Sequence, residues 1–142
     1  MSEKIQIKEI LENNSTIAIV GVSRNSAKDS NRVCEYLMNE GYKIIPINPS
    51  ITEVLGKPCS PSITEVPNKL KERIEIVNIF RPSEDVTHIV EDAIRIKEEH
   101  GKLKVIWTQL GITNKLAAEK ARKSGIIVIE DKCIQTEHQS IE

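Results

Sequence analysis

The sequence predicts an α/β fold in which helices cover both faces of a doubly wound parallel sheet of about five strands. Short apolar runs rich in β-branched residues alternate with amphipathic stretches of helical spacing, and most junctions carry glycine or proline. Continuous apolar runs are typical of strands buried on both faces. Strands that alternate with helices favour right-handed crossovers, and therefore a parallel sheet.

In the first half of the chain, a short amphipathic helix is expected to end near residues 13–14, before a first strand at Thr16–Val20. A second helix begins at about Ser30, and Gly41 ends it as a C-cap. The second strand covers residues 42–47, and a loop with several turn residues follows.

The second half of the chain repeats this alternation. Ser83 is expected to cap a helix that Gly101 ends, and Thr113 is expected to cap one that Gly125 ends. The remaining strands are expected at residues 74–80, 103–107 and 126–129, and the polar residues after them are expected to form a short final element or to fray.

For the sheet, the expected strand order is 3-2-1-4-5. Ligands of such sheets bind at the carboxyl ends of the strands, where the order reverses. In this order the reversal lies between the first and fourth strands, so residues 21–29 and 108–113 would flank the crevice. We expect residues 1–142 to form one domain.

Composition excludes several classes of function. The formal net charge of -1 argues against general nucleic-acid binding, and 3% aromatic residues leave few platforms for base stacking. No apolar run has the length of a membrane span, and the charged N-terminus lacks a signal-peptide core, which favours the cytoplasm. Three widely spaced cysteines form neither a disulfide framework nor a zinc motif, so no metal is expected.

The stretch from Thr16 to Arg32 carries the strongest functional signal. A buried strand leads into Gly21, a polar loop and the start of a helix. Backbone N–H groups and the helix dipole favour an anion at such a place. Arg24, Lys28 and Arg32 add positive charge, so this stretch is interpreted as a phosphate-binding loop.

Two familiar ligand classes fit poorly. Dinucleotide sites use G-x-G-x-x-G and an acidic residue after the second strand, whereas this loop has only Gly21 and the second strand ends in Asn48-Pro49. Phosphoacceptor domains need carboxylates at the end of the first strand to hold magnesium, and Gly21-Val22-Ser23 stands there instead.

Six short motifs, in this order and spacing, resemble the stand-alone CoA-binding protein family, which is similar to the CoA-binding domain of the succinyl-CoA synthetase α subunit and of ADP-forming acyl-CoA synthetases. They are G-V-S-R-N-S followed by S-N-R-V, Y-K-I-I-P-I-N-P, E-V-L-G-K-P, I-V-N-I-F-R-P-S-E, V-I-W-T-Q-L-G-I and D-K-C-I. The resemblance covers the chain from about Ile10 to His138. It implies a Rossmann-like fold that holds coenzyme A.

The resemblance also implies a set of ligand-binding residues. Those at the phosphates and the first helix would be Gly21, Ser23, Arg24, Asn25, Ser26, Ser30 and Arg32; those around the nucleotide would be Asn48, Pro49, Phe80, Arg81 and Pro82; and those along the pantetheine arm would be Gln109, Leu110 and Gly111. Independently of the resemblance, a cationic loop beside a helix N-terminus suits the phosphates of coenzyme A.

The related ligases act through a phosphohistidine in a second domain, for which this sequence leaves no room, and none of its histidines matches a catalytic position. The expected function is therefore a non-catalytic CoA or acyl-CoA binding module. An NAD(P)-binding oxidoreductase or redox sensor is the alternative, and a protein–protein interaction module is a third interpretation. A homodimer is compatible with a domain of this size.

Each of these residues also has an ordinary structural interpretation. Ser30 could simply cap a helix, Arg32 and Arg81 could be surface charges, and Asn48-Pro49 could be a turn that ends a strand. Trp107 is interpreted as core. Cys133 follows the fifth strand near the predicted ligand face, which motivates the hypothesis that it forms a mixed disulfide with the thiol of coenzyme A.

Overall fold

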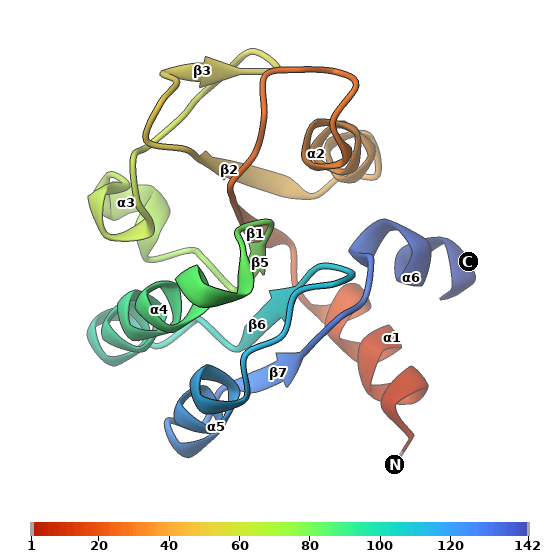
Figure 1. Ribbon diagram of the computed structural model, residues 1–142, viewed down its shortest axis with the longest axis vertical. Coiled ribbons are helices and arrows are strands. Elements are labelled where there is room, and N and C mark those ends of the chain that lie inside the picture. The colour runs from red at the N-terminus through yellow and green to blue at the C-terminus, as the bar shows by residue number, and fades with distance from the viewer. Residues whose placement is uncertain (1, 142) are drawn as a thin grey trace.

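In the computed structural model, which describes residues 2–141, a five-stranded parallel sheet lies between two layers of helices (Figure 1). This confirms the predicted fold class. The sheet strands are β1 (Thr16–Val20), β2 (Lys43–Ile47), β5 (Ile76–Ile79), β6 (Val105–Thr108) and β7 (Ile127–Ile129). The helices are α1 (Glu3–Asn13), α2 (Asp29–Asn39), α3 (Asn68–Lys71), α4 (Val86–His100), α5 (Lys115–Lys123) and α6 (Ile134–Ile141), with short 3₁₀ turns η1 (Ile63–Glu65) and η2 (Ser83–Asp85).

The predicted strand order was wrong. The sheet runs β2-β1-β5-β6-β7, so the third long strand pairs with β1 on the side opposite β2. Pro46 explains the edge position of β2, because a proline cannot donate to a second neighbouring strand. Ser60 N–H donates to Pro46 O (3.2 Å), which shows that the polar backbone of Pro46 faces the outer edge.

The correction moves the reversal of strand order to the gap between β1 and β5. There Val20 pairs with Ile47 on one side and with Ile79 on the other. The reversal is therefore flanked by the loop after β1 and the loop after β5. Gln109, Leu110 and Ile112 of the expected segment 108–113 line a cavity farther along this edge, on the side of α2 and α6.

Each face of the sheet carries its own apolar core, because successive side chains of a strand point to opposite faces. Ile17, Ile19 and Trp107 pack with α1, α2 and α6 on one face, while Ala18 and Val20 belong to the core beneath α4 and α5. Trp107 is fully buried and donates from Nε1 to Lys132 O (2.8 Å), which confirms its interpretation as core.

The structure adds a hairpin that the sequence did not predict, and it shows that the polar C-terminal residues form a short final element, one of the two expected alternatives. Residues 51–61, expected to be a loop, hold a small hairpin of β3 (Glu53–Val54) and β4 (Lys57–Pro58), turned by Leu55 and Gly56 with φ of 50° and 76°. The C-terminal residues form α6, which lies beside α1 and α2 (Figure 1).

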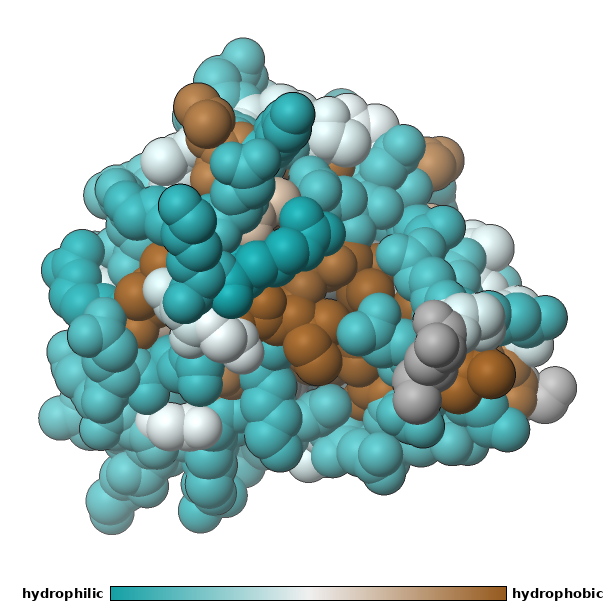
Figure 2. Space-filling view, turned by 90° about the horizontal axis from the view of Figure 1, so that it is seen from below, coloured by the Kyte–Doolittle hydropathy of each residue, from teal (hydrophilic) through white to brown (hydrophobic). Residues whose placement is uncertain are grey.

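The surface also has an apolar area. Figure 2 shows it framed by hydrophilic residues on the underside of the view in Figure 1, the side on which β7, α5 and the beginning of α1 lie. Ile127 of β7 and Ile5 of α1 are among the exposed large apolar residues. None of the helices within residues 2–141 is long and apolar enough to cross a membrane.

Candidate functional site

Gly21, directly after β1, brings the two loops of the crevice into contact. It has a φ of 92°, and its N–H donates to Ile47 O (2.9 Å) at the end of β2. A Cβ at this position would lie 3.2 Å from the carbonyl carbon and oxygen of Phe80 and 3.0 Å from Cδ of Arg81. Both the backbone conformation and the lack of space therefore require glycine here.

The loop after Gly21 is held by side chains that bond to its own backbone. Ser30 Oγ accepts from Ser23 N–H (2.9 Å), and Asn31 Nδ2 donates to Ser23 O (2.8 Å). Ser23 Oγ in turn accepts from Asn25 N–H (3.0 Å), and Asn25 Oδ1 accepts from Ala27 N–H (2.9 Å). Ser23, Asn25 and Ser30 thus shape the loop rather than extend freely from it.

Positive charge surrounds the start of α2. The N-cap residue, Lys28, makes no side-chain capping bond. The N–H groups of Asn31 and Arg32 donate to Lys28 O (both 3.2 Å), whereas those of Asp29 and Ser30, at the very start of the helix, are the donors that an anion could use. Arg24 is exposed and has no ion-pair partner within residues 2–141. Arg32 is more constrained, because it donates to Ala27 O (2.7 Å) and pairs with Asp29. The loop can therefore offer an anion both backbone donors and a mobile guanidinium group.

Asn48 occupies the place where dinucleotide sites carry an acid. Its Nδ2 donates to Val22 O (2.8 Å), and its Oδ1 accepts from Ser50 N–H (2.7 Å). The side chain thus ties the end of β2 to the glycine loop.

Two cavities open at this edge of the sheet, one on each side of the loop after β5. The first, of about 360 Å³, lies on the α4 side; the second, of about 390 Å³, lies on the side of α2 and α6. Gly21 and Arg81 line the first cavity, whereas Phe80 and Arg32 line the second. The loop that joins Gly21 to α2 therefore runs from the first cavity to the second, because Asp29 and Arg32 of α2 line the second.

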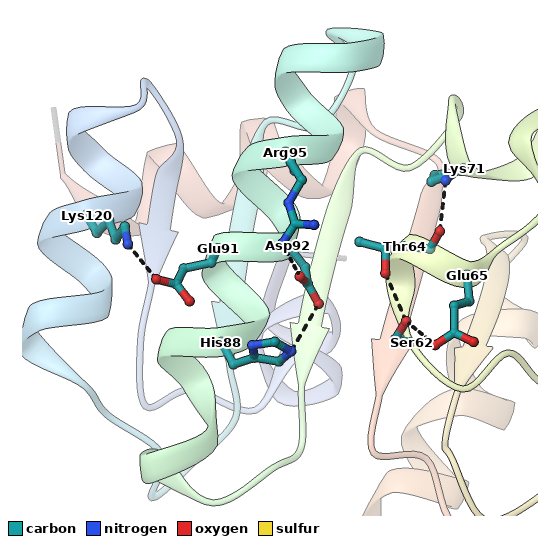
Figure 3. Close-up of polar contacts among 9 residues, drawn as sticks. All are labelled: Ser62, Thr64, Glu65, Lys71, His88, Glu91, Asp92, Arg95 and Lys120. Atoms are coloured by element: carbon teal, nitrogen blue, oxygen red, sulfur yellow. Dashed lines mark hydrogen bonds and ion pairs between the residues drawn. The ribbon is translucent and has the colours of Figure 1, made fainter.

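The first cavity has mostly apolar walls and a polar end. Its apolar lining comes from Val20, Ile47, Pro49, Pro61, Ile63 and Ile89. At the polar end, Asp92 accepts from Arg95 NH2 (3.1 Å) and lies 3.7 Å from Nε2 of His88 (Figure 3). Arg81 pairs with Asp85 (2.9 Å) at the exposed rim.

The second cavity is organised around Gln109, which is buried at the end of β6. Gln109 Oε1 accepts from Asn78 Nδ2 (3.1 Å) and from Ile134 N–H (3.0 Å). Asn78 is fully buried, and its Oδ1 has no partner within residues 2–141. Gly111 N–H donates to Asp131 Oδ1 (2.5 Å), which fixes the loop above.

Cys133 lies in this second cavity, just before α6. Burial is the largest single influence and raises the pKa of its thiol, but hydrogen bonds from Thr136, Gln109 and Gln135 together outweigh it. The pKa of Cys133 therefore lies below the ordinary value for cysteine. Burial instead raises the pKa of Cys34 to about 12, which leaves that thiol protonated. Cys133 is thus more readily deprotonated than Cys34 or Cys59, since burial raises the pKa of Cys59 as well.

Most of the residues expected at the ligand surround these cavities. Those that line a cavity are Gly21, Arg32, Pro49, Phe80, Arg81, Gln109 and Leu110; those that build the adjoining loops are Ser23, Asn25, Ser30, Asn48 and Gly111; and Arg24 and Ser26 are exposed on the loop itself. Pro82 lines neither cavity and begins the η2 turn, where its carbonyl accepts from Asp85 N–H (2.9 Å).

Four polar residues of the site were missed. Asn31, Asn78, Asp92 and Asp131 were not singled out in the sequence. Two of them carried a signal, because Asn78 interrupts the apolar strand I-V-N-I and Asp92 lies three residues after Ile89 on the core face of α4.

Comparison of the sequence with known protein families shows which family the chain belongs to. The CoA binding domain matches residues 15–139. The chain belongs to this CoA-binding domain family. The match covers the glycine loop, both cavities and most of α6.

Two proteins are similar to this chain over most of their length. The uncharacterized protein YneT of Bacillus subtilis (strain 168) is 36% identical over 135 residues, 95% of this chain and 93% of that protein. A hypothetical protein from Pyrococcus horikoshii OT3 has a solved structure with a TM-score of 0.87 and 36% identity, covering 96% of this chain and 90% of that one.

A larger enzyme also contains a similar region. The ADP-forming acetate–CoA ligase I of Archaeoglobus fulgidus is 26% identical over 124 residues, which are 83% of this chain but only 17% of the ligase. The similarity therefore concerns one part of that enzyme.

Proposed function

We propose that this protein binds coenzyme A or an acyl-CoA as a carrier, sensor or accessory module, without turning it over. The observation that supports this best is the pair of cavities at the ends of the glycine loop, at the reversal of strand order. Family membership and the related region of a CoA ligase point to the same ligand.

The shape and charge of the site suggest how the ligand would lie. The apolar first cavity suits the adenine ring, and the loop of residues 23–28 with the start of α2 suits the pyrophosphate. Arg24 and Lys28 would then contact phosphate oxygens. The pantetheine arm would follow Phe80 and Gln109 through the second cavity, with its thiol near Cys133.

Asn48 in place of an acidic residue weakens the alternative of NAD(P), because its amide bonds to Val22 O and Ser50 N–H and lacks the carboxylate that holds both ribose hydroxyls. A redox role would require a nicotinamide cofactor in the same two cavities.

We place the protein in the cytoplasm, as its sequence suggests.

A thermal-shift panel tests the proposal. Coenzyme A and acetyl-CoA are expected to raise the melting temperature, since a ligand that binds only the folded state stabilises it. NAD, NADP, ADP and FAD should have smaller effects. A shift with NAD or NADP alone would move the protein to the redox class, and no shift with any ligand would favour a protein–protein interaction module.

A further inference from the structure

Asp92 is an unusual residue for the wall of a largely apolar cavity. It lies on α4 among Ile89, Val90 and Ala93, and only 8% of its side chain is exposed. Buried carboxylates are costly unless they are hydrogen-bonded. In Figure 3 the Asp92 carboxylate points from α4 toward the segment that carries Ser62, which forms the opposite wall.

The hydrogen bonds that Asp92 receives from the protein use only part of the acceptor capacity of its carboxylate. Oδ1 accepts from Arg95 NH2 (3.1 Å), and Oδ2 lies 3.7 Å from His88 Nε2, which is longer than a hydrogen bond. Both partners belong to the same helix, with 63% and 79% of their side chains exposed, and His88 itself lies at the wall of the cavity. A carboxylate has about four acceptor sites. Asp92 therefore keeps acceptor capacity for a donor in the cavity.

The other polar groups of the cavity are less suited to bind a ligand inside it. Ser62 Oγ donates to Glu65 Oε1 (2.9 Å) and lies 3.0 Å from Thr64 Oγ1. Asp85 holds Arg81 at the rim, and Glu84 is exposed. Asp92 is thus the carboxylate placed beside the apolar walls.

The chemistry of this arrangement selects among flat heterocycles. The apolar walls would stack on a ring, while a carboxylate accepts hydrogen bonds and cannot donate them. Adenine presents an exocyclic amino group, whereas hypoxanthine carries a carbonyl oxygen at the same position. We propose that Asp92 accepts a hydrogen bond from the amino group of adenine and so makes the site specific for that base. This inference rests on the proposed binding of coenzyme A.

Calorimetric titration with two ligands tests it. Coenzyme A is compared with its deaminated analogue, in which hypoxanthine replaces adenine. The wild-type protein should bind coenzyme A roughly 10- to 100-fold more tightly, because a carbonyl would face the carboxylate. In Asp92→Asn, whose amide can donate as well as accept, the preference should fall to about threefold or less.

Glu91→Gln is the matched control. Glu91 is the neighbour of Asp92, but its carboxylate pairs with Lys120 on α5 (2.6 Å), away from the cavity (Figure 3). This variant should keep the wild-type preference. If Asp92→Asn does not fold, Asp92→Ser takes its place, and the same fall in preference is expected because a hydroxyl can also donate as well as accept.

The outcomes separate the two claims. Equal affinity of the wild-type protein for both ligands would overturn the role of Asp92 and leave the binding of coenzyme A intact. An unchanged preference in Asp92→Asn would also overturn that role. Failure of the wild-type protein to bind either ligand would overturn the proposed function itself.

Discussion

Gly21 lies so close to Phe80 that a Cβ on the glycine would come within 3.2 Å of the Phe80 carbonyl group. The contact joins the carboxyl ends of β1 and β5, the two strands between which the strand order reverses. Since Arg81 lines one cavity and Phe80 the other, this contact lies between the two.

Gly21→Ala should therefore impair both stability and binding. The positive φ and the close contact with backbone atoms predict a loss of about 1–3 kcal/mol in the free energy of unfolding, measured by denaturant titration. Affinity for coenzyme A should fall at least tenfold. Gly101→Ala is the control, because Gly101 also has a positive φ (83°) but has no atom within 4 Å of the added Cβ. Its affinity should not change, and an equal loss of affinity in the two variants would contradict this account.

The buried side chain of Asn31 should hold the loop after Gly21 in its conformation. Asn31→Ala removes the donor to Ser23 O and is expected to cost about 1–3 kcal/mol in unfolding free energy. Because the loop would no longer be held in place, coenzyme A should bind more weakly. Asn114→Ala, which removes the N-cap of α5, should destabilise to a similar degree without affecting affinity. Calorimetry on both variants checks the difference; unchanged affinity in Asn31→Ala would argue against a preorganised loop.

Arg24 should contribute to ligand binding but not to the stability of the fold. Arg24→Ala is expected to weaken coenzyme A binding by about 1–2 kcal/mol through loss of a charge-assisted hydrogen bond, and to leave the unfolding free energy nearly unchanged. The salt dependence of binding should also decrease. Arg122→Ala, which removes a cation from α5, should leave both quantities as they are. Wild-type affinity in Arg24→Ala would remove this residue from the phosphate site.

Cys133 should react with oxidised coenzyme A. Its thiolate would attack one sulfur of the CoA disulfide, forming a Cys133–CoA mixed disulfide and releasing one CoA thiolate. Intact mass spectrometry should detect one adduct, which Cys133→Ser abolishes. Cys34, with a pKa of about 12, should not react. No adduct on the wild-type protein would end the hypothesis.

The pH dependence of this reaction follows from the lowered pKa. The reactive form is the thiolate, so the rate should rise with pH through the pKa of Cys133 and then level off. Because hydrogen bonds hold that pKa below the ordinary value for cysteine, the midpoint should lie below the midpoint for an unperturbed cysteine in a short blocked peptide. A midpoint above that of the peptide would contradict the hydrogen-bonded site around the sulfur.

Much of the fold could be predicted because its signals are local. The buried strands are continuous apolar runs, and glycines mark the ends of three helices. Strand order is a long-range property, and the expected order was wrong although Pro46 indicated an edge strand. The β3–β4 hairpin escaped prediction because its strands are two residues long and contain glutamate, lysine and proline.

The candidate site likewise combines features that are local in sequence with contacts between distant residues. The loop from Gly21 to Ser30 was predicted from residues adjacent in sequence. Asn78 and Gln109 are 31 residues apart, and Gly111 and Asp131 are 20 apart, so no local pattern pairs them. A polar residue inside an apolar strand or on the core face of a helix is the signal that would have identified Asn78 and Asp92.

Calorimetric titration of the wild-type protein with coenzyme A tests the central claim most directly. We predict saturable binding of one coenzyme A per chain, tighter than that of NAD or NADP, and a rise in melting temperature on the order of 10 °C at a ligand concentration of 100 times Kd. Absence of binding, or binding of NAD or NADP in preference to coenzyme A, would contradict the account.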